Sequence, residues 1–468
     1  MGTPGQRWRR FATAFLRRAG RAPAAACAVG LALRLAAAAL PVAPSWDGVI
    51  YERAAARLAD GAGYTLRIYD PAWPWDLPTA FYPPGWPAVL ALWKGLGAAR
   101  GFDLVLQALL GALAIPLAAA LTRRLVPRRP RAPARAAWLV ALWPGGVLAT
   151  AGWMTEPLFT VALLAALLPL VGSPAETRAR TVGQLGLAAL LFGLAAYVRP
   201  TALAIAPLAL AARGASLASI GGAPDDCRPS VPGAGGTATD VDPAAGTSRR
   251  PGARHSTPGA SRWRPALGAA LLALFALAPL APWMARNAAQ LDGAVVSSNA
   301  GANLYVGTVD ARFTRIPDDL DCPAGPRELA RDRCRRERAL ARIADDPLGW
   351  LALGVAKLGH TFGYEASPAL QLGASLERRA PPQAALLALS ASCTLFWLAL
   401  LGGALAHAPR LGRRCLPCWA AVASLAATHF VFLGGDRYHL PLVPILAALA
   451  TAGAASASGS LPPDAAAR

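Results

Sequence analysis

Asp47 is the carboxylate best placed in the sequence to do chemistry. It follows a long apolar segment by a few residues and stands next to Trp46. A carboxylate there is half removed from water, and because burial disfavours the charged form, we expect its pKa to be raised. A raised pKa suits a general base that takes a proton from a hydroxyl group. The structural alternative is that Asp47 caps a helix over residues 48–58, as aspartate commonly does.

Three arginines flank other apolar segments and could bind an anion. Arg199 precedes Pro200 between two such segments, Arg286 follows another, and Arg437 lies between the last two. Arginine binds phosphate through a two-pronged fork and stays charged at any relevant pH. Three guanidinium groups on one side would neutralise a phosphate leaving group. Each arginine alone is more typical of an interfacial residue or an ion-pair partner, and Asp436 stands beside Arg437.

Further polar and aromatic residues accompany these groups. We expect them to line a substrate vestibule: Tyr51, Tyr82, Trp86, Glu156, Asn287, Asp436 and His439. The aromatic residues are equally typical of the belts that anchor proteins at a membrane interface. An ionisable residue near membrane depth is a site hypothesis by default, although a short solvated turn would hold Glu156 as well. Arg34, within the first apolar segment, is predicted to face the bundle interior because charge at the span centre is costly.

The composition indicates what positions these residues. Of 468 residues, 55% are hydrophobic and 15% are charged, whereas a soluble domain carries roughly a quarter charged residues. The apolar residues come in blocks long enough to cross a hydrocarbon layer. The sequence therefore predicts an all-α polytopic membrane protein. Ten spans are predicted: 22–42, 102–121, 136–152, 157–172, 183–198, 201–213, 266–283, 383–405, 415–433 and 440–457.

The charge pattern orients these spans. The formal net charge is +20, and all basic residues except Lys94 and Lys357 are arginine. The arginines cluster at 7–21, 123–135, 249–264 and 410–414, and alternating the spans from a cytoplasmic N-terminus places every cluster inside. Both termini are then cytoplasmic, in the inner (plasma) membrane. No basic face interleaved with aromatic residues accompanies this charge, so the clusters do not indicate nucleic-acid binding.

The spans divide the chain into a small number of parts. A basic tail (1–21) precedes an N-terminal membrane module (22–213) whose first outer loop is 43–101. A Gly-, Pro- and Ala-rich cytoplasmic insertion (214–262) is predicted to be disordered. The C-terminal membrane module (263–457) carries an outer segment at 284–382, and residues 458–468 form a cytoplasmic tail. Two apolar stretches, 86–98 and 350–359, are too short to cross and are interpreted as outer interfacial helices, the first entered through Pro83 and Pro84.

Several chemistries lack their sequence signals. Neither GxGxxG nor GxxxxGK[ST] occurs, which argues against a nucleotide site. The five histidines show no zinc-ligand spacing, and no metal ligand is assigned, although the need for a divalent cation stays open. Cys415 and Cys418 form a CxxC that is more typical of helix packing than of a redox site. Cys322 and Cys334 lie together in an outer segment, and the sequence is compatible both with a disulfide between them and with two free thiols.

Taken in order, these motifs resemble the GT-C class of integral-membrane glycosyltransferases. That class uses polyprenyl-phosphate sugars and includes protein mannosyltransferases, the lipid A aminoarabinose transferase and the Rgt-like bacterial branch. The resemblance covers residues 20–457 without the insertion. It is carried by Asp47 with Tyr51, Gly61 and Gly63-Tyr64, Tyr82-Pro83-Pro84-Gly85, Thr155-Glu156, Arg199-Pro200, Trp283 with Arg286-Asn287, Asn303-Leu304, and Arg437-Tyr438 with Leu440-Pro441.

The resemblance implies a function and a set of roles. Asp47 would be the catalytic residue, and Arg199, Arg286 and Arg437 would bind the donor phosphate. The partners implied are a polyprenyl-phosphate sugar and an acceptor lipid, glycan or protein of the cell envelope, with a hexosyl or pentosyl group transferred outside the cytoplasm, with inversion. Many relatives have a second acidic residue after this aspartate, where this chain has Gly48. A lipid-linked glycan flippase and a polysaccharide polymerase or ligase are the alternatives.

Overall fold

The computed structural model describes residues 21–44, 46–66, 77–97, 103–152, 154–172, 178–218, 263–312, 322, 328–376 and 381–457. The predicted tails at 1–21 and 458–468 lie outside the described residues, except for Arg21, and so does the insertion from residue 219 to residue 262. The side chain of Trp46 also lies outside the described part.

The described residues form helices, joined by short connections and two isolated bridges, from Val42 to Leu376 and from Thr65 to Pro78. The apolar helices are α2 (Arg21–Ala38), α5 (Asp103–Leu125), α6 (Ala132–Leu142), α7 (Pro144–Leu148), α8 (Glu156–Leu167), α9 (Arg178–Ala196), α10 (Thr201–Ala218), α11 (Trp263–Leu277), α17 (Gln383–His407), α18 (Leu416–Val431) and α19 (Val443–Ala457). The remaining α-helices are α3 (Trp46–Ala59), α4 (Gly85–Gly95), α12 (Ala281–Leu291), α13 (Ala300–Val306), α14 (Glu328–Asp345), α15 (Pro347–Phe362) and α16 (Ser367–Ser375). Short 3-10 helices are η1 (Ala149–Ala151), η2 (Leu168–Leu170), η3 (Ala278–Leu280), η4 (Ala408–Cys415) and η5 (Asp436–Leu442).

The helices confirm an all-α polytopic membrane fold. Six helical stretches of the described chain are long and apolar enough to cross a membrane, and one of them, Gln383–Val431, contains both α17 and α18. Three shorter apolar helices, Ala132–Leu142, Glu156–Leu170 and Thr201–Gly214, coincide with three further predicted spans. The two stretches predicted to be too short to cross form α4, which begins directly after Pro83 and Pro84, and α15.

One predicted span is broken. The segment 136–152 is not one continuous helix, because α6 ends at Leu142 and α7 begins at Pro144. The intervening residue, Trp143, is extended, with φ −61° and ψ 112°. Proline lacks a backbone N–H and disfavours helical geometry in the residue before it, which explains the break. The indole of Trp143 instead donates a hydrogen bond of 2.8 Å to Glu365.

The core of the bundle surrounds α19. Residues of α19 pack against α5, α6 and α17, and most of the segment Asp436–Ser456 is buried. Outside this centre, α2 packs on α5 and α6, and α10 packs on α9 and α18. Arg34 of α2 points into the bundle as predicted: it is 1% exposed and donates to the carbonyls of Gly30, Val140 and Ala141.

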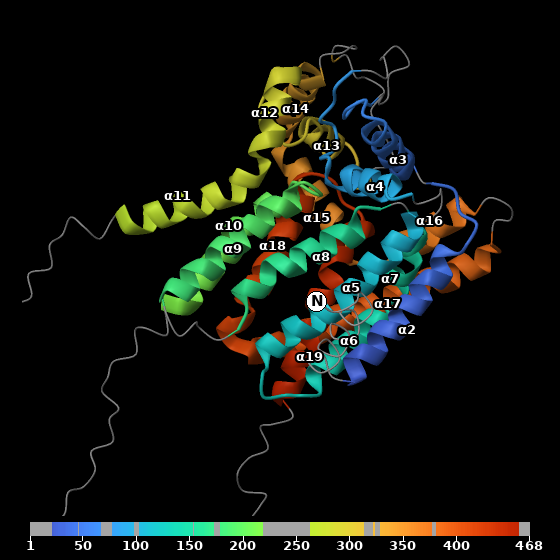
Figure 1. The fold of residues 1–468 in the computed structure, drawn as a ribbon, viewed down its shortest axis with the longest axis vertical. Helices are drawn as coiled ribbons and strands as arrows, with labels where there is room; N and C mark the ends of the chain where they lie inside the picture. The colour runs from blue at the N-terminus through green and yellow to red at the C-terminus, as the bar shows by residue number, and fades with distance from the viewer. Residues whose placement is uncertain are drawn as a thin grey trace, which may run out of the picture.

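The two segments predicted to lie outside the membrane come together. In Figure 1, α3 and α4 of the first segment gather at the same end of the molecule as α12, α13 and α14 of the second. Glu328, at the start of α14, accepts hydrogen bonds from the Thr79 hydroxyl at 2.6 Å and from the Ala80 amide at 2.8 Å. These contacts tie the second segment to the first.

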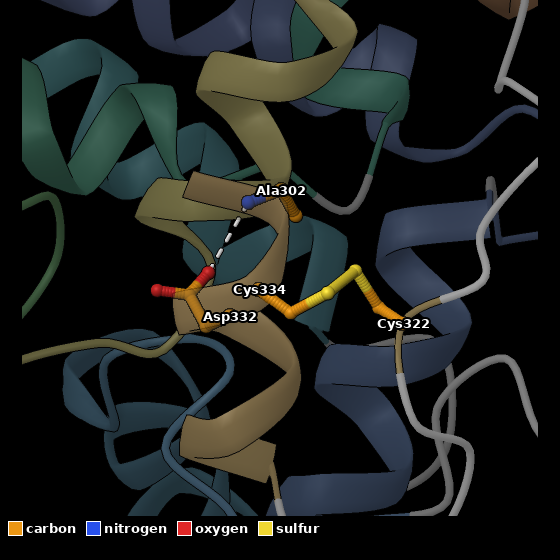
Figure 2. The surroundings of a disulfide bond; sticks show 4 residues. All are labelled: Ala302, Cys322, Asp332 and Cys334. Carbon is orange, nitrogen blue, oxygen red and sulfur yellow. Dashed lines mark hydrogen bonds between the residues drawn. A yellow bond between two sulfur atoms is a disulfide. The ribbon is translucent and has the colours of Figure 1, made fainter. Parts of the chain in front are cut away.

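A disulfide strengthens the second segment. Cys322 and Cys334, whose pairing the sequence left open, are joined, as Figure 2 shows. In the same picture, Asp332 of α14 accepts a hydrogen bond from the amide of Ala302 in α13. The disulfide therefore holds α14 in place, and α14 in turn holds α13 through Asp332. Cys415 and Cys418 are both buried free thiols.

Candidate active site

Residues from distant parts of the chain meet where α3, α8 and η5 approach one another. Asp47 is the second residue of α3, and Glu156 is the first residue of α8. Arg199 lies between α9 and α10, and Arg437 and Tyr438 belong to η5. These five residues are called the site cluster below.

Two glycines allow the backbone approaches that bring these residues together. The Gly85 amide donates 2.8 Å to the carbonyl of Tyr197, just before Arg199, and a Cβ on Gly85 would lie 2.5 Å from that oxygen. Gly434, just before η5, packs so closely that a Cβ would lie 2.6 Å from the carbonyl of Ala311. Any larger residue would push these segments apart.

The first ion pair joins α3 to η5. Arg437 NH1 donates to Asp47 Oδ2 at 2.8 Å, across 390 residues of sequence. The other carboxylate oxygen, Oδ1, accepts a hydrogen bond of 3.1 Å from the Tyr82 hydroxyl. Both members of the pair remain partly accessible: the Asp47 side chain is 22% exposed and the Arg437 side chain is 26% exposed.

The second ion pair joins Glu156 to Arg199. The NH2 group of Arg199 lies 2.5 Å from Glu156 Oε1, and its Nε donates to the Thr155 hydroxyl at 2.9 Å. Glu156 is much less accessible than Asp47, with its side chain 3% exposed. Arg199 is thus held at two points by the beginning of α8.

The ring of Tyr438 connects the two ion pairs. The Cζ atom of Arg437 lies 5.0 Å from the ring centroid, and that of Arg199 lies 5.7 Å from it. The imidazole of His429 stacks on the ring, with centroids 4.3 Å apart and planes inclined by 14°. A guanidinium within about 6 Å of an aromatic face is attracted to it. Tyr438 therefore holds two positive groups close together.

The prediction that the pKa of Asp47 is raised is wrong. Burial does raise this pKa, but the charge of Arg437, hydrogen bonds from Arg437 and Tyr82, and the charge of Arg199 together lower it below the ordinary value. The desolvation of Asp47 follows from its neighbours in the sequence, whereas a partner 390 residues away does not. The capping alternative is not observed either, because Asp47 lies within the first turn of α3.

The aromatic residues predicted beside Asp47 are near it, but they are largely buried. Tyr51 is 6% exposed, and its ring centroid lies 5.1 Å from that of Tyr82. Trp86 is 1% exposed and packs in the same apolar cluster as Tyr51. Tyr82 is the member of the three whose hydroxyl reaches the carboxylate. Tyr51 and Trp86 thus belong to the buried apolar cluster that packs next to the site.

Arg286 does not join the other two arginines through any described contact. Its NH1 and NH2 groups donate to the carbonyls of Thr79 and Tyr64, each at 2.8 Å. NH1 also donates to the side chain of Asn287, which is fully buried and donates in turn to the Val295 carbonyl. The predicted vestibule position of Asn287 is therefore wrong, and the contacts of Arg286 are those of a structural clamp.

Asp436 and His439 were also predicted to line the vestibule, and the structure places both in the interior. Asp436, 4% exposed, accepts from the amides of Ala366 and Ser367 at the start of α16. His439 is fully buried and stacks on Trp397, with centroids 3.7 Å apart. Its Nε2 lies 3.0 Å from Glu365 Oε2. Because η5 is a tight helix, consecutive residues point in different directions, and only Arg437 and Tyr438 turn to the site.

Two members of the surroundings were missed by sequence reasoning. The sequence motif around Tyr438 predicts no role for its ring, and His429 lies within a predicted span. His429 Nδ1 donates to the Leu433 carbonyl at 2.6 Å, which orients the ring under Tyr438. A histidine eight residues before an Arg-Tyr pair is a weak signal, because only the bend between α18 and η5 brings the rings together.

The described residues offer no evident metal site. No three His, Cys, Asp or Glu side chains in this part of the chain gather closely enough to hold a metal ion. What the site cluster provides is a carboxylate for proton transfer and two guanidinium groups for an anion.

The sequence matches no protein-family model and no curated protein. Two solved structures share part of its helical arrangement. One is ArnT from Cupriavidus metallidurans bound to undecaprenyl phosphate, at 15% identity and a TM-score of 0.41. The other is the apo state of the same protein, at 16% identity and a TM-score of 0.38. Each alignment covers 92% of this chain and 77% of that chain. These values are too low to assign the chain to a family.

Proposed function

We propose that the protein is a membrane glycosyltransferase of the GT-C type, which transfers a hexosyl or pentosyl group from a polyprenyl-phosphate donor to an acceptor hydroxyl. The observation that carries the proposal is the direct contact between Asp47 and Arg437, with Arg199 on the same tyrosine ring. A carboxylate next to two guanidinium groups matches a reaction that needs both a base and a phosphate-binding group.

The reaction would be a single displacement. The Asp47 carboxylate takes the proton from the acceptor hydroxyl while the acceptor oxygen forms a bond to the anomeric carbon. The bond from that carbon to the phosphate oxygen breaks, and the lipid phosphate leaves with the electron pair. Tyr82 holds Asp47 through its other oxygen. Because attack and departure occur on opposite sides of the carbon, this mechanism predicts inversion.

Arg199 and Arg437 would stabilise the negative charge that develops on the departing phosphate. Arg286 has no part in this step, since its guanidinium is already bonded to backbone carbonyls. Tyr438 would keep the two active guanidinium groups at one location.

We place the reaction on the extracytoplasmic face. The arginine clusters between the spans support this orientation through the positive-inside rule, and both termini are then cytoplasmic. The donor would enter from the bilayer, and the acceptor would be an envelope lipid, glycan or protein.

The test is transfer by membranes that contain the wild-type protein and a panel of radiolabelled polyprenyl-phosphate sugars. We expect label to move from the lipid to an acceptor, with inverted anomeric configuration in the product. Label that crosses the bilayer without leaving the lipid would contradict the proposal and favour a flippase. Transfer only from diphosphate donors would favour the polymerase or ligase. The same assay with EDTA tests whether a divalent cation is needed.

A further inference from the structure

The site cluster is electrically balanced before any substrate binds. Asp47 and Glu156 contribute two negative charges, and Arg199 and Arg437 contribute two positive ones. A phosphodiester donor carries one negative charge, so it meets no unpaired guanidinium. Binding the donor phosphate at these arginines adds a third negative charge to the site, which favours the opening of one of the two ion pairs.

The two pairs differ in how easily they open. Arg199 is held by Glu156 and by Thr155, and the Glu156 side chain is 3% exposed. Removing a partner from a carboxylate buried to that extent is strongly unfavourable. Asp47 and Arg437 share one hydrogen bond, and their side chains are 22% and 26% exposed. The Asp47 pair is accordingly the weaker of the two.

Arg437 also has a second contact that does not depend on Asp47. Its NH2 group donates to the Tyr438 hydroxyl at 3.3 Å, and its Cζ lies 5.0 Å from the Tyr438 ring centroid. A small rotation of the guanidinium on this ring would release Asp47 and keep the arginine beside Arg199. Asp47 would remain fixed by Tyr82.

We propose that the donor phosphate exchanges with Asp47 on Arg437, so that the base is released only when the donor is bound. In the free protein Arg437 restrains Asp47; in the complex Arg437 and Arg199 share the phosphate, and the Glu156 pair stays closed. This inference rests on the proposed function and describes its regulation. It prevents Asp47 from acting before a sugar is present.

The exchange has an electrostatic consequence at Asp47. The charge of Arg437 is the main contribution that lowers the pKa of this carboxyl against the effect of burial. Once Arg437 turns to the phosphate, burial and the neighbouring phosphate charge both raise the pKa. A carboxylate with a higher pKa is the stronger base. The charged and titratable groups around Asp47 are Tyr51, Tyr82, Glu156, Arg199, His429, Arg437 and Tyr438.

The test uses farnesyl methyl phosphate, a prenyl phosphodiester without an anomeric carbon, which cannot be transferred. Its affinity is measured for the purified full-length chain in detergent by calorimetry. We expect Asp47→Asn to bind this probe about fivefold more tightly than wild type, because no ion pair has to open. The matched control is Glu52→Gln, which removes the same charge from α3 five residues on, beside Lys94, and we expect its affinity to stay within about twofold.

Unchanged or weaker binding by folded Asp47→Asn would overturn the exchange, and so would an absence of saturable binding to wild type. If Asp47→Asn does not fold, a measurement on the wild-type chain still tests the exchange. Its affinity for the probe, which itself does not titrate, should be higher at acidic than at neutral pH, because the exchange raises the pKa of Asp47 and couples binding to proton uptake. An affinity that is constant across this range would overturn the proposal. Because no sugar is transferred here, these results are independent of whether the transfer assay succeeds.

Discussion

Two groups of charged residues at the same end of the molecule combine arginine with a carboxylate in opposite ways. In the site cluster, each arginine pairs directly with a carboxylate, and one pair is partly open to solvent. In the second group, which we call the anchor cluster, the carboxylate and the arginine bond to other partners. Its members are Tyr64, Thr79, Arg286, Ser298 and Glu328.

In the anchor cluster the carboxylate has both side-chain and backbone partners, and two backbone carbonyls hold the arginine. Glu328 accepts from the hydroxyls of Thr79 and Ser298 and from the Ala80 amide. Arg286 donates to two backbone carbonyls and lies 4.9 Å from the Trp283 ring. Backbone groups cannot leave without local unfolding, whereas a side-chain partner can rotate away. The kind of partner, more than the presence of arginine, therefore separates a binding group from a structural one.

The largest expected difference between the clusters is catalytic. Arg437→Gln removes one of two guanidinium groups at the phosphate, so we expect kcat to fall about 10²- to 10³-fold. The matched change Arg286→Gln removes the same charge from the anchor cluster, and kcat per folded molecule should stay within about threefold. Steady-state transfer assays on both variants check this. Equal losses of kcat would mean that the two clusters do not differ as described.

The disulfide should matter for stability and not for chemistry. Replacing Cys322 and Cys334 with serine opens a loop closed across 12 residues, and the expected loss is about 3 kcal/mol of unfolding free energy. Denaturation of wild type with and without reductant gives the same comparison without a mutation. A variant as stable as wild type would show that the disulfide does not support α14.

Arg286→Gln should also destabilise the outer segments, to a smaller extent. The carbonyls of Tyr64 and Thr79 each lose a donor, which costs about 2 kcal/mol in total. Thermal unfolding monitored by tryptophan fluorescence measures the change, with Arg437→Gln as the control. If Arg437→Gln is less stable than Arg286→Gln, the structural role has been assigned to the wrong cluster.

The smallest effect is a difference in pH dependence. Burial raises the pKa of Glu328, against the opposing hydrogen bonds of Ser298, Thr79 and Ala80. The folded state thus holds this proton more tightly than the unfolded state, so stability falls as pH rises from the ordinary carboxyl value through the raised one. The Tm of wild type relative to Glu328→Gln should therefore increase as the pH falls from about 8 to about 5. A relative Tm that decreases over this range would contradict the assignment.

The contribution of Asp47 to stability depends on pH in the opposite direction. Its pKa is lowered, so its ion pair stabilises the fold above the ordinary carboxyl pKa, and that contribution is lost as the pH falls through the lowered value. In the range used for Glu328, the Asp47 pair of the free protein is intact. The pH series on Glu328 is therefore not obscured by the site cluster.

Much of the fold follows from local patterns in the sequence. Apolar blocks define the helices, Pro83 and Pro84 define the start of α4, and the cost of a buried charge turns Arg34 inward. The break at Trp143 was missed because the block 136–152 is apolar throughout, although Pro144 was visible as its cause. Each of these features depends on residues near one another in the chain.

The partners in the candidate site depend on contacts between distant residues. Nothing near Asp47 in sequence indicates Arg437, and the motifs around Arg286 and Arg437 look equally suited to phosphate. Arg437 and His439 are separated by one residue, yet one reaches the site and the other stacks on Trp397. Position within a 3-10 helix decides this, and the sequence alone does not specify that geometry.

The central claim is that Asp47 is the base, and the most direct measurement compares two variants of α3 in the transfer assay. Asp47→Asn should reduce transfer at least about 10³-fold, although it binds farnesyl methyl phosphate more tightly than wild type. Glu52→Gln, five residues on in the same helix, should transfer at close to the wild-type rate. Near-wild-type turnover by folded Asp47→Asn would contradict the account, because another group would then have to take the proton.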